Sequence, residues 1–279
     1  MCSSDLECRV GLLSRGYRSL GPDGNDEKLV LDQLCPGIPH WQDRDRRSSA
    51  ETAVREAGCN LLILDDAFQH RRLRRDLDIV LIDATSPWGF GHCLPRGLLR
   101  EPVSAVSRAD LVLVTRADLV PPETLTAIRT ELARHAQVAG VIEVAFRPTT
   151  LINSLGEQRP VSELVTARSR CVTFCGIGNP ESFEQSLRRQ NIGVVAARTF
   201  PDHHHFTEAD VADLTTWAES QTADCVLTTF KDLVKIRQPS FGSRPLWAVQ
   251  IGFEPLRGTP ILEHHLWRIA AMAKQVTLN

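Results

Sequence analysis

Lysine is scarce in this 279-residue chain, and no pair of cysteines has the spacing of a metal or redox motif. Lysine plus arginine total 32 against 34 aspartates and glutamates, so the formal net charge is −2. A balance so close to neutrality favours attraction neither to nucleic acid nor to a membrane. No apolar run approaches the ~20 residues that a membrane-spanning helix needs. The eight cysteines include no Cys-x-x-Cys pair, and we expect free thiols, as in a reducing cytoplasm.

The sequence also lacks Gly-x-x-x-x-Gly-Lys-[Ser/Thr], the loop with which many nucleotide-binding proteins hold phosphates. None of the lysines lies in a glycine-rich loop; they are Lys28, Lys231, Lys235 and Lys274. Gly176-x-Gly178 follows a predicted strand, but a third glycine is missing. A tight strand-to-helix turn is therefore the simpler interpretation of this pair.

Short apolar runs alternate with helical patterns along the chain. The hydrophobic fraction of 42% and the mean hydropathy of −0.15 indicate a globular protein with enough material for a core. Strands are predicted within residues 10–17, 61–66, 79–82, 111–114, 172–174, 193–197 and 225–229. Helices are predicted to begin near residues 28, 50, 121, 180 and 207. This alternation predicts βαβ units, a parallel sheet and an α/β fold.

The regular pattern weakens between Phe146 and about Arg170, where Leu155-Gly156-Glu157-Gln158 has the composition of a hairpin turn. The length of 279 residues suits one large domain or two of ordinary size. We therefore place a domain junction in this region. This junction divides the chain into a predicted core domain at residues 1–147 and a predicted smaller α/β domain at residues 148–279.

Two carboxylates, Asp65 and Asp66, directly follow the apolar run Leu61-Leu62-Ile63-Leu64. Such a run predicts a strand buried on both faces of a parallel sheet. Open α/β sheets bind ligands at the carboxyl ends of their strands, and an aspartate there can hold the magnesium of a bound nucleotide. The alternative is a solvated turn with an aspartate cap. The adjacent Phe68-Gln69-His70-Arg71-Arg72 favours a site because it adds an amide, an imidazole and two guanidiniums.

The densest group of ionisable residues is Asp202-His203-His204-His205. Successive side chains point apart, so the three histidines cannot all face one metal, and a zinc site would need a further spaced ligand. A general base or proton relay suits these imidazoles better because they titrate near neutral pH. A solvated loop is the alternative. Asp26-Glu27 either caps the helix that follows or acts chemically with a partner from elsewhere in the chain.

Taken together, these segments resemble the lipid A 4′-kinase (tetraacyldisaccharide 4′-kinase) family. The shared motifs, in chain order, are Leu13-Ser14-Arg15-Gly16-Tyr17, Asn25-Asp26-Glu27, Asp43-Arg44-Asp45-Arg46, Asp65-Asp66-x-Phe68-Gln69-His70-Arg71-Arg72, Leu94-Pro95, Leu99-Arg100-Glu101-Pro102, Gly176-Ile177-Gly178-Asn179-Pro180, Phe200-Pro201-Asp202-His203-His204 and Thr228-Thr229-x-Lys231-Asp232. The resemblance covers residues 9 to about 270. The Asp-Asp-x-Phe-Gln-His and Phe-Pro-Asp-His-His pair, in this order, is highly specific.

The resemblance implies a P-loop NTPase-like parallel sheet domain joined to a smaller α/β domain. The implied reaction transfers the γ-phosphoryl group of ATP to the 4′-hydroxyl of a tetraacylated glucosamine disaccharide 1-phosphate. The resemblance further implies Mg²⁺ as a cofactor beside ATP. It places such a protein on the cytoplasmic face of the inner membrane, where it would be peripheral to the membrane surface.

Matching the motifs position by position gives the implied site residues. Asp26 corresponds to the base that takes the proton of the sugar hydroxyl, and His203 to its histidine partner. Asp65 and Asp66 correspond to the carboxylates that hold magnesium and the nucleotide. Contacts with the sugar-phosphate head of the lipid are implied for Arg15, Tyr17, Arg46, Gln69 and His70. Phe230 departs from the family pattern, which usually has glutamate at this position.

In the family, the phosphate loop lies upstream of the motif that contains Arg15. We therefore interpret the chain as a member truncated at its start, without the first strand and the loop, and its kinase activity as doubtful. One alternative is a non-catalytic remnant that binds the lipid head group through Arg15, Arg46 and His70. A weaker alternative is a metal-dependent hydrolase built on the paired aspartates and the histidine run.

Overall fold

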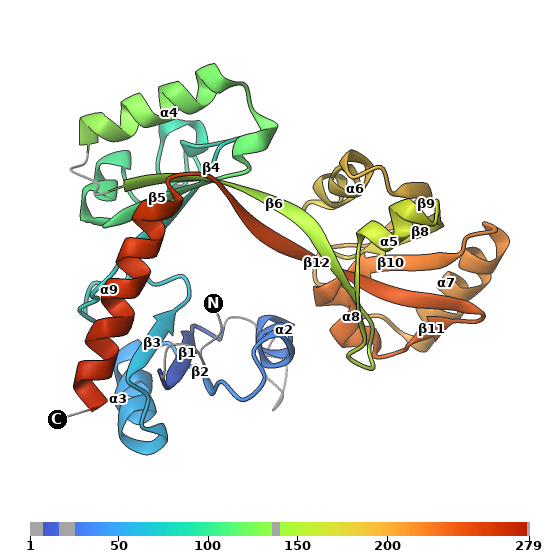
Figure 1. Ribbon diagram of the computed structural model, residues 1–279, viewed down its shortest axis with the longest axis horizontal. Helices are drawn as coiled ribbons and strands as arrows, with labels where there is room; N and C mark the ends of the chain where they lie inside the picture. The colour runs from blue at the N-terminus through green and yellow to red at the C-terminus, as the bar shows by residue number, and fades with distance from the viewer. Residues whose placement is uncertain (1–7, 17–25, 136–139, 278–279) are drawn as a thin grey trace. The chain divides into compact units, whose positions relative to one another are not determined.

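The computed structural model describes residues 8–16, 26–135 and 140–277, with all their side chains except those of Asp26, Glu27, Val276 and Thr277 (Figure 1). Tyr17 therefore lies outside the described residues, and so does the Asp26 side chain. The chain folds into two compact units. Unit 1 comprises Met1–Arg18, Gly37–Phe146 and Phe253–Asn279, and unit 2 comprises Ser19–Pro36 and Arg147–Gly252.

These units differ from the predicted domains in two segments. The predicted boundary after residue 147 is one residue from an observed crossing, but Ser19–Pro36 belongs to unit 2 and Phe253–Asn279 belongs to unit 1. Two long strands, β6 (Gly140–Ile152) and β12 (Arg244–Arg257), run from one unit into the other. The hydrophobic pattern of the sequence could not show which unit these two segments join, because that depends on which distant segments pack together.

Unit 1 is built from parallel strands with helices packed on them. Its strands are β1 (Val10–Ser14), β2 (His40–Gln42), β3 (Leu61–Leu64), β4 (Ile79–Asp83), β5 (Leu111–Thr115) and the start of β6. β1 pairs in parallel with β2 and β3, and β5 pairs in parallel with β4 and β6. Its helices are α3 (Arg46–Ala57), α4 (Pro122–His135) and α9 (Thr259–Thr277), with 3₁₀ turns at Gly89–Gly91, Val103–Arg108 and Ala117–Leu119.

The central strand β5 is covered on both faces. Its side chains alternate, so that Val112 packs in one cluster with Ile128 of α4, and Leu113 packs in another with Leu262 of α9. All five residues of β5 are buried. A parallel strand between two layers of helices needs such a continuous apolar sequence.

The prediction that Leu61–Leu64 is buried on both faces is wrong. Ile63 on β3 is 54% exposed, and Leu81 on β4 is 63% exposed. In the described part of the chain, β3 and β4 each have a single neighbouring strand and lie at the edge of a sheet. The sequence of both strands is that of an interior strand, but only one side of each is paired.

In unit 2, the strands β12, β10, β8 and β9 pair in parallel in this order, as part of the nine-stranded sheet that also contains β4, β5 and β6. Its elements are α2 (Asp26–Leu34), β7 (Gln158–Pro160), α5 (Ser162–Thr166), β8 (Arg170–Cys175), α6 (Pro180–Arg189), β9 (Gly193–Thr199), α7 (Glu208–Ser220), β10 (Cys225–Thr229), α8 (Phe230–Ile236) and β11 (Ser240–Phe241). Phe174 of β8 packs with Leu214 of α7, whereas Cys175 packs with Leu187 of α6. Leu29 of α2 packs on the first of these clusters, and α2 contacts α8.

The start of α3 differs from the prediction. The sequence predicts a helix from Ala50, whereas Asp45 caps the helix and Arg46 is its first residue. The Asp45 side chain accepts hydrogen bonds from two backbone N–H groups that the first turn leaves unpaired. The sequence predicts that Gly58 closes this helix, and Gly58 does so in the left-handed conformation. Arg46 is thereby held in a helical turn and does not belong to a loop.

Threonine caps begin both helices next to the histidine run. The sequence predicts Thr207 and Asp210 as a capping pair, and in the structure they form the capping box of α7. The sequence predicts a strand exit at Phe230-Lys231-Asp232, but these residues form the first turn of α8. Its cap is Thr229, whose side chain accepts a hydrogen bond from the Asp232 N–H. The cap was missed because the predicted strand already included this threonine.

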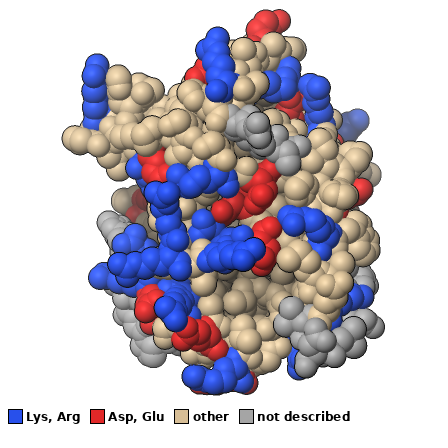
Figure 2. Space-filling model, turned by 90° about the vertical axis from the view of Figure 1, so that its left-hand side faces the viewer, with Lys and Arg blue, Asp and Glu red and all other residues tan. Residues whose placement is uncertain are grey.

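Charged side chains of both signs share the surface. On the face drawn in Figure 2, Lys and Arg side chains gather in a band that Asp and Glu side chains interrupt. This distribution is consistent with the nearly neutral total charge. Among the described helices, none combines the length and the apolar character needed to cross a membrane.

Candidate functional site

The residues predicted for the site fall into two groups, one in each unit. Unit 1 holds, within its described residues, Arg15, Arg46, Asp65, Asp66, Gln69 and His70. Unit 2 holds His203 and the backbone of Asp26, which begins α2. The predicted contribution of Tyr17 lies outside the described residues.

The first group is centred on two aspartates that directly follow β3; with Arg15, Arg46 and Arg100 they form what we call the β3-end cluster. Asp65 and Asp66 are both exposed. Arg100 Nη1 donates to Asp66 Oδ1 at 2.5 Å, and this bond together with the Asp66 charge raises the pKa of Arg100. The Asp65 carboxylate makes no hydrogen bond or ion pair with another described residue. The cluster thus offers one paired and one unpaired carboxylate.

Arg46 fixes the backbone at the end of β3. It is 3% exposed, and its Nη1 donates a 2.7 Å hydrogen bond to the Asp65 carbonyl. Burial lowers the pKa of Arg46, the charges of Asp65 and Asp66 oppose this effect, and Arg15 adds to it. Two arginines and both aspartates therefore lie within reach of one another's charge. The predicted head-group ligand Arg46 is, in this structure, a buried support for the aspartate turn.

Gln69 and His70 lie in the turn after the aspartates. The His70 N–H donates to the Ala67 carbonyl at 2.8 Å, and Arg75 Nη1 donates to the His70 carbonyl at 2.7 Å. Gln69 is exposed, whereas His70 Nε2 is buried without a hydrogen-bond partner among the described residues. Both residues therefore follow the aspartates on a turn that is stabilised by hydrogen bonds to its own backbone.

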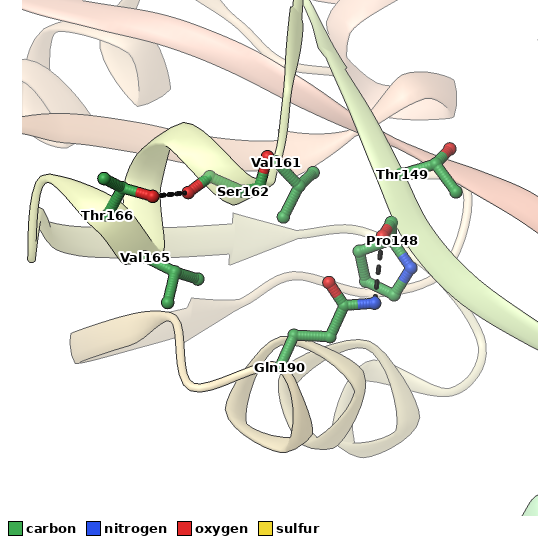
Figure 3. Close-up of a pocket in the computed structure, with 7 residues that line it drawn as sticks. All are labelled: Pro148, Thr149, Val161, Ser162, Val165, Thr166 and Gln190. Atoms are coloured by element: carbon green, nitrogen blue, oxygen red, sulfur yellow. Dashed lines mark hydrogen bonds between the residues drawn. The ribbon is translucent and has the colours of Figure 1, made fainter.

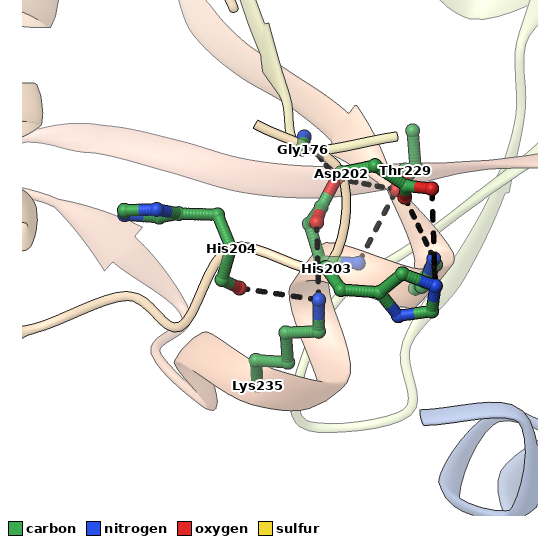
Figure 4. A network of polar contacts seen from close by, with 8 residues as sticks. Gly176, Asp202, His203, His204, Thr229 and Lys235 are labelled. Carbon is green, nitrogen blue, oxygen red and sulfur yellow. Dashed lines mark hydrogen bonds and ion pairs between the residues drawn. The ribbon is translucent and has the colours of Figure 1, made fainter. Parts of the chain in front are cut away.

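The second group lies around the histidine run, and we call Asp202, His203, Lys231 and Asp232 the histidine-loop cluster (Figure 4). His203 has a backbone φ of 62°, which a residue other than glycine seldom adopts. Lys231 Nζ lies 3.1 Å from Asp202 Oδ1 and 3.4 Å from His203 Nε2. Burial raises the pKa of Asp202, but Lys231 and His203 together bring that pKa below its ordinary value. Asp202 is therefore a carboxylate at neutral pH.

Asp232 is fully buried and joins three segments of unit 2. Its Oδ2 accepts hydrogen bonds from the Gly176 N–H at 2.9 Å and from Thr229 Oγ1 at 2.6 Å. Lys235 Nζ lies 3.8 Å from Asp232 Oδ1 and donates to the His204 carbonyl at 3.2 Å. These contacts connect the turn after β8, the start of α8 and the histidine run (Figure 4).

Sequence reasoning assigned no role to Arg100, Lys231 or Asp232. All three stand in motifs that carry the family resemblance, and Lys231 is one of four lysines in the chain. That scarcity was the available signal. Their roles emerge only from contacts with Asp66, His203 and the Gly176 turn, which lie 34, 28 and 56 residues away in the chain.

The other two histidines of the run do not join His203. His204 Nε2 lies 3.2 Å from Asp210 Oδ2, and its ring packs against Phe200, whereas His205 is exposed. This divergence is the one expected of successive side chains. In the residues that the structure describes, no group of three or more His, Cys, Asp or Glu side chains is arranged to hold a metal ion.

A hollow of about 400 Å³ lies elsewhere on unit 2 (Figure 3). Its lining residues are Pro148, Thr149, Val161, Ser162, Val165, Thr166 and Gln190. Gln190 Nε2 donates to the Pro148 carbonyl at 2.9 Å. The lining contains no ionisable side chain and none of the predicted site residues, so the hollow offers no acid–base chemistry.

The LpxK family model, described as tetraacyldisaccharide-1-P 4'-kinase, matches residues 3–270. This chain belongs to the LpxK family. It is 37% identical to the tetraacyldisaccharide 4'-kinase of Anaeromyxobacter sp. (strain K), over 96% of this chain and 75% of that relative. It is 33% identical to the tetraacyldisaccharide 4'-kinase of Halothermothrix orenii, over 82% of this chain and 66% of that relative.

A solved LpxK structure has the same fold. It is the crystal structure of LpxK from Aquifex aeolicus in complex with ATP, which matches with a TM-score of 0.73 and 26% identity. The match covers 95% of this chain and 81% of that chain. It confirms the predicted α/β, P-loop NTPase-like fold class. The LpxK family model likewise confirms the resemblance drawn from the sequence motifs.

Proposed function

We propose that this LpxK-family chain carries the site of a lipid kinase. The reaction is transfer of the γ-phosphoryl group of ATP to the 4′-hydroxyl of a tetraacylated glucosamine disaccharide 1-phosphate. The observation that carries the proposal is the pair of exposed carboxylates at the end of β3, with arginines around it. Phosphoryl transfer depends on a metal, on cations and on a positioned acceptor. The ATP in the Aquifex aeolicus relative supports a nucleotide site.

The residues after β3 fit a magnesium ion. Mg²⁺ prefers oxygen ligands and is usually bound through one or two carboxylates together with substrate phosphates. Asp65 provides an unpaired carboxylate, and Asp66 one that it shares with Arg100. We assign both to magnesium and to the nucleotide. When bound, such an ion neutralises charge on the phosphate oxygens.

We assign activation of the acceptor hydroxyl to Asp26 and His203. Both belong to unit 2, where α2 begins at Asp26 and contacts α8, which carries Lys231 beside His203. In this assignment Asp26 takes the proton of the sugar hydroxyl, and His203 is its partner. A carboxylate within hydrogen-bond reach of an alcohol can act as general base in this way.

We assign the sugar-phosphate head of the lipid to residues that can bind phosphate and hydroxyl groups. They are Arg15, Tyr17, Gln69 and His70, while the buried Arg46 supports the turn after β3 through its bond to the Asp65 carbonyl. Arginine binds phosphate through two parallel N–H groups, and Arg15 and Gln69 are exposed. Because the substrate is a membrane lipid, we propose peripheral binding at the cytoplasmic face of the inner membrane.

The proposal extends to the activity of the 279 residues by themselves. Their sequence contains no Gly-x-x-x-x-Gly-Lys-[Ser/Thr] loop, whose backbone N–H groups cradle nucleotide phosphates. Loss of one preorganised donor reduces kcat by about 10²- to 10³-fold, and such a loop supplies several donors. We therefore expect negligible phosphoryl transfer until a phosphate loop is supplied.

The test compares two proteins in a radiolabelled ATP assay with Mg²⁺ and the tetraacyldisaccharide lipid. One is the 279-residue chain, and the other is the same chain preceded by the strand and phosphate loop of a relative. We expect product with the second protein alone, and no product when Asp65→Asn is introduced or when the added loop lysine is replaced by methionine. Product from the 279-residue chain would contradict the expected inactivity. Failure of the extended protein to phosphorylate while it binds ATP would contradict the kinase assignment.

A second candidate is non-catalytic binding of the lipid head group. The observation that favours it is the arginine-rich β3-end cluster in a sequence without a phosphate loop. This candidate predicts that calorimetry detects binding of the lipid but not of ATP, and that Arg15→Ala weakens lipid binding. Binding of Mg²⁺-ATP to the 279-residue chain would count against it.

A further inference from the structure

Lys231 contacts an imidazole nitrogen as well as a carboxylate. Its Nζ lies 3.4 Å from His203 Nε2 and 3.1 Å from Asp202 Oδ1. An ammonium group has three N–H donors and no acceptor. In this contact Lys231 therefore donates and His203 Nε2 accepts. An accepting ring nitrogen carries no proton.

A hydrogen bond across this contact requires an unprotonated Nε2 on His203. A neutral imidazole whose Nε2 is unprotonated carries its hydrogen on Nδ1. An imidazolium would present N–H groups at both nitrogens and could not accept from Lys231. The tautomer of a histidine is set by the bond that its other nitrogen makes. Here the Lys231 ammonium selects the tautomer with Nδ1–H.

The backbone of Lys231 is fixed by its neighbour Asp232. The buried Asp232 carboxylate is bonded to Gly176 N–H and to Thr229 Oγ1, so the first turn of α8 is tied to the turn after β8. This junction is tightly packed, because a Cβ added to Gly176 would lie 3.3 Å from both Asp232 Oδ1 and His204 Cβ. Lys231 therefore extends toward His203 from a rigid helical turn.

The backbone of His203 is fixed as well. The N–H of His204 donates to the Pro201 carbonyl at 3.1 Å. The carbonyl of His204 accepts a hydrogen bond from Lys235 Nζ at 3.2 Å. His203 between them has the left-handed φ of 62°. Residues hold such conformations where the surroundings determine them, often at functional sites. The Lys231–His203 contact thus joins two constrained segments.

A carboxylate lies beside this contact. The Asp202 carboxylate lies against the same ammonium, and its Oδ2 is 3.8 Å from His203 Nε2. The Lys231 side chain thus reaches a carboxylate oxygen and an imidazole nitrogen of two successive residues.

We propose that Lys231 is a positioning residue that fixes His203 as the neutral tautomer protonated on Nδ1, so that Nδ1–H is the donor that His203 presents to a carboxylate. The inference deepens the proposed function and rests on it in one respect, the assignment of that carboxylate to Asp26. A histidine that donates from Nδ1 can orient a carboxylate base toward the substrate hydroxyl.

The tautomer can be measured directly in the 279-residue chain. Long-range proton–nitrogen NMR of ¹⁵N-histidine protein at neutral pH distinguishes protonated from unprotonated ring nitrogens, and His203→Gln identifies the signals of His203. We expect a protonated Nδ1 and an unprotonated Nε2. A proton on Nε2, or on both nitrogens, would overturn the inference.

Variants test whether Lys231 causes this state. We expect Lys231→Met to remove the preference for Nδ1–H and Lys231→Arg, which keeps a cationic donor, to retain it. Lys274→Met on α9 of unit 1 is the matched loss of a lysine and is expected to leave the His203 signals unchanged. Unchanged signals in a folded Lys231→Met protein would overturn the inference. If Lys231→Met does not fold, the His203 signals of the unmodified chain and of Lys231→Arg test the inference, and Nε2–H in either protein would overturn it.

A kinetic arm separates this inference from the proposed function. In the chain extended with a phosphate loop, we expect Lys231→Met to lower kcat by about 10- to 100-fold, the scale of one charged hydrogen bond, with KM unchanged. Lys231→Arg is expected to recover most of kcat. If the NMR tautomer is as expected but the extended chain has no kinase activity, the proposed function fails and the inference stands. If the extended chain is an active kinase but His203 carries its proton on Nε2, the inference fails and the proposed function stands.

Discussion

Asp66 and Arg100 form an ion pair at the end of β3, with 2.5 Å between Asp66 Oδ1 and Arg100 Nη1. Asp65, one residue earlier, has no such partner among the described residues. Two adjacent carboxylates of the same chemical type therefore differ in how readily they can bind a cation. Arg100 lies in the loop after β4, so the pair also joins two segments 34 residues apart.

The first prediction is that Arg100→Ala strengthens binding of Mg²⁺ because it releases Asp66 from its ion pair. Exposed ion pairs contribute about 0.2–1 kcal/mol, so we expect up to about fivefold tighter binding. Isothermal titration calorimetry measures this change. Arg188→Ala, which removes a similar exposed pair with Glu184 on α6, is the control and should leave affinity unchanged. Weaker Mg²⁺ binding in Arg100→Ala would show that Arg100 supports the carboxylates instead of competing for them.

The second prediction concerns the buried Arg46. Arg46→Met removes the donor to the Asp65 carbonyl, and a hydrogen bond from a charged group contributes about 1.5–3 kcal/mol. We expect the free energy of unfolding in urea to fall by about this amount. The adjacent Arg47→Met is the control, since the Arg47 side chain is 72% exposed and surface changes usually stay within about 0.5 kcal/mol. Equal losses of unfolding free energy in the two variants would mean that the contact with the Asp65 carbonyl does not stabilise the fold.

The third prediction is a loss of stability in acid that depends on Asp210. Hydrogen bonds from the Thr207 N–H and hydroxyl lower the pKa of Asp210, and His204 contributes. Because the folded pKa lies below the unfolded one, this stability is present above about pH 4 and is lost as pH falls through the folded value. Urea unfolding between pH 6 and pH 2.5 measures the slope.

Asp210→Asn separates charge from capping in that experiment. Asparagine still accepts the N-terminal hydrogen bonds but does not titrate, so the slope of stability against pH should flatten below about pH 4. Asp76→Asn, at an exposed site in unit 1, is the control and should keep the original slope. A slope unchanged by Asp210→Asn would assign the acid sensitivity to other carboxylates.

The fourth prediction concerns thiol reactivity. The seven described cysteines are free, and Cys171 and Cys225 lie on adjacent strands with 3.4 Å between their Sγ atoms. The bond to Cys171 and burial raise the pKa of Cys225, and burial with the Asp232 charge raises that of Cys175 to about 11. Since the thiolate is the reactive form, Cys225 and Cys175 should resist a thiol reagent until urea unfolds the chain, and Cys171 should resist it because it is fully buried. Among the described cysteines, half-buried Cys35 and Cys93 should react first, as mass spectrometry of labelled peptides can show.

Much of the fold follows from local sequence. The apolar runs at β5, β8 and β10 predicted strands, and Gly58 and the Thr207–Asp210 pair predicted helix ends, because each of these signals acts within a few residues. The family motifs around Asp65 and His203 predict the LpxK family, which the family model confirms.

Other features could not be predicted because they depend on distant contacts. Four apolar residues predicted a strand buried on both faces, yet Ile63 is exposed, because burial depends on which strand lies alongside. Lys231 and Asp232 looked like a strand exit, and only their bonds to His203 and Gly176 show what they hold in place.

The sequence by itself determined the family, the α/β class and the types of residue that the site requires, because motifs and periodicity are local properties of the chain. The tertiary structure alone decided which aspartate is paired, which arginine is buried and which lysine meets the histidine. Those outcomes depend on hydrogen bonds and burial between residues that are far apart in sequence, and a linear pattern contains no information on such distances.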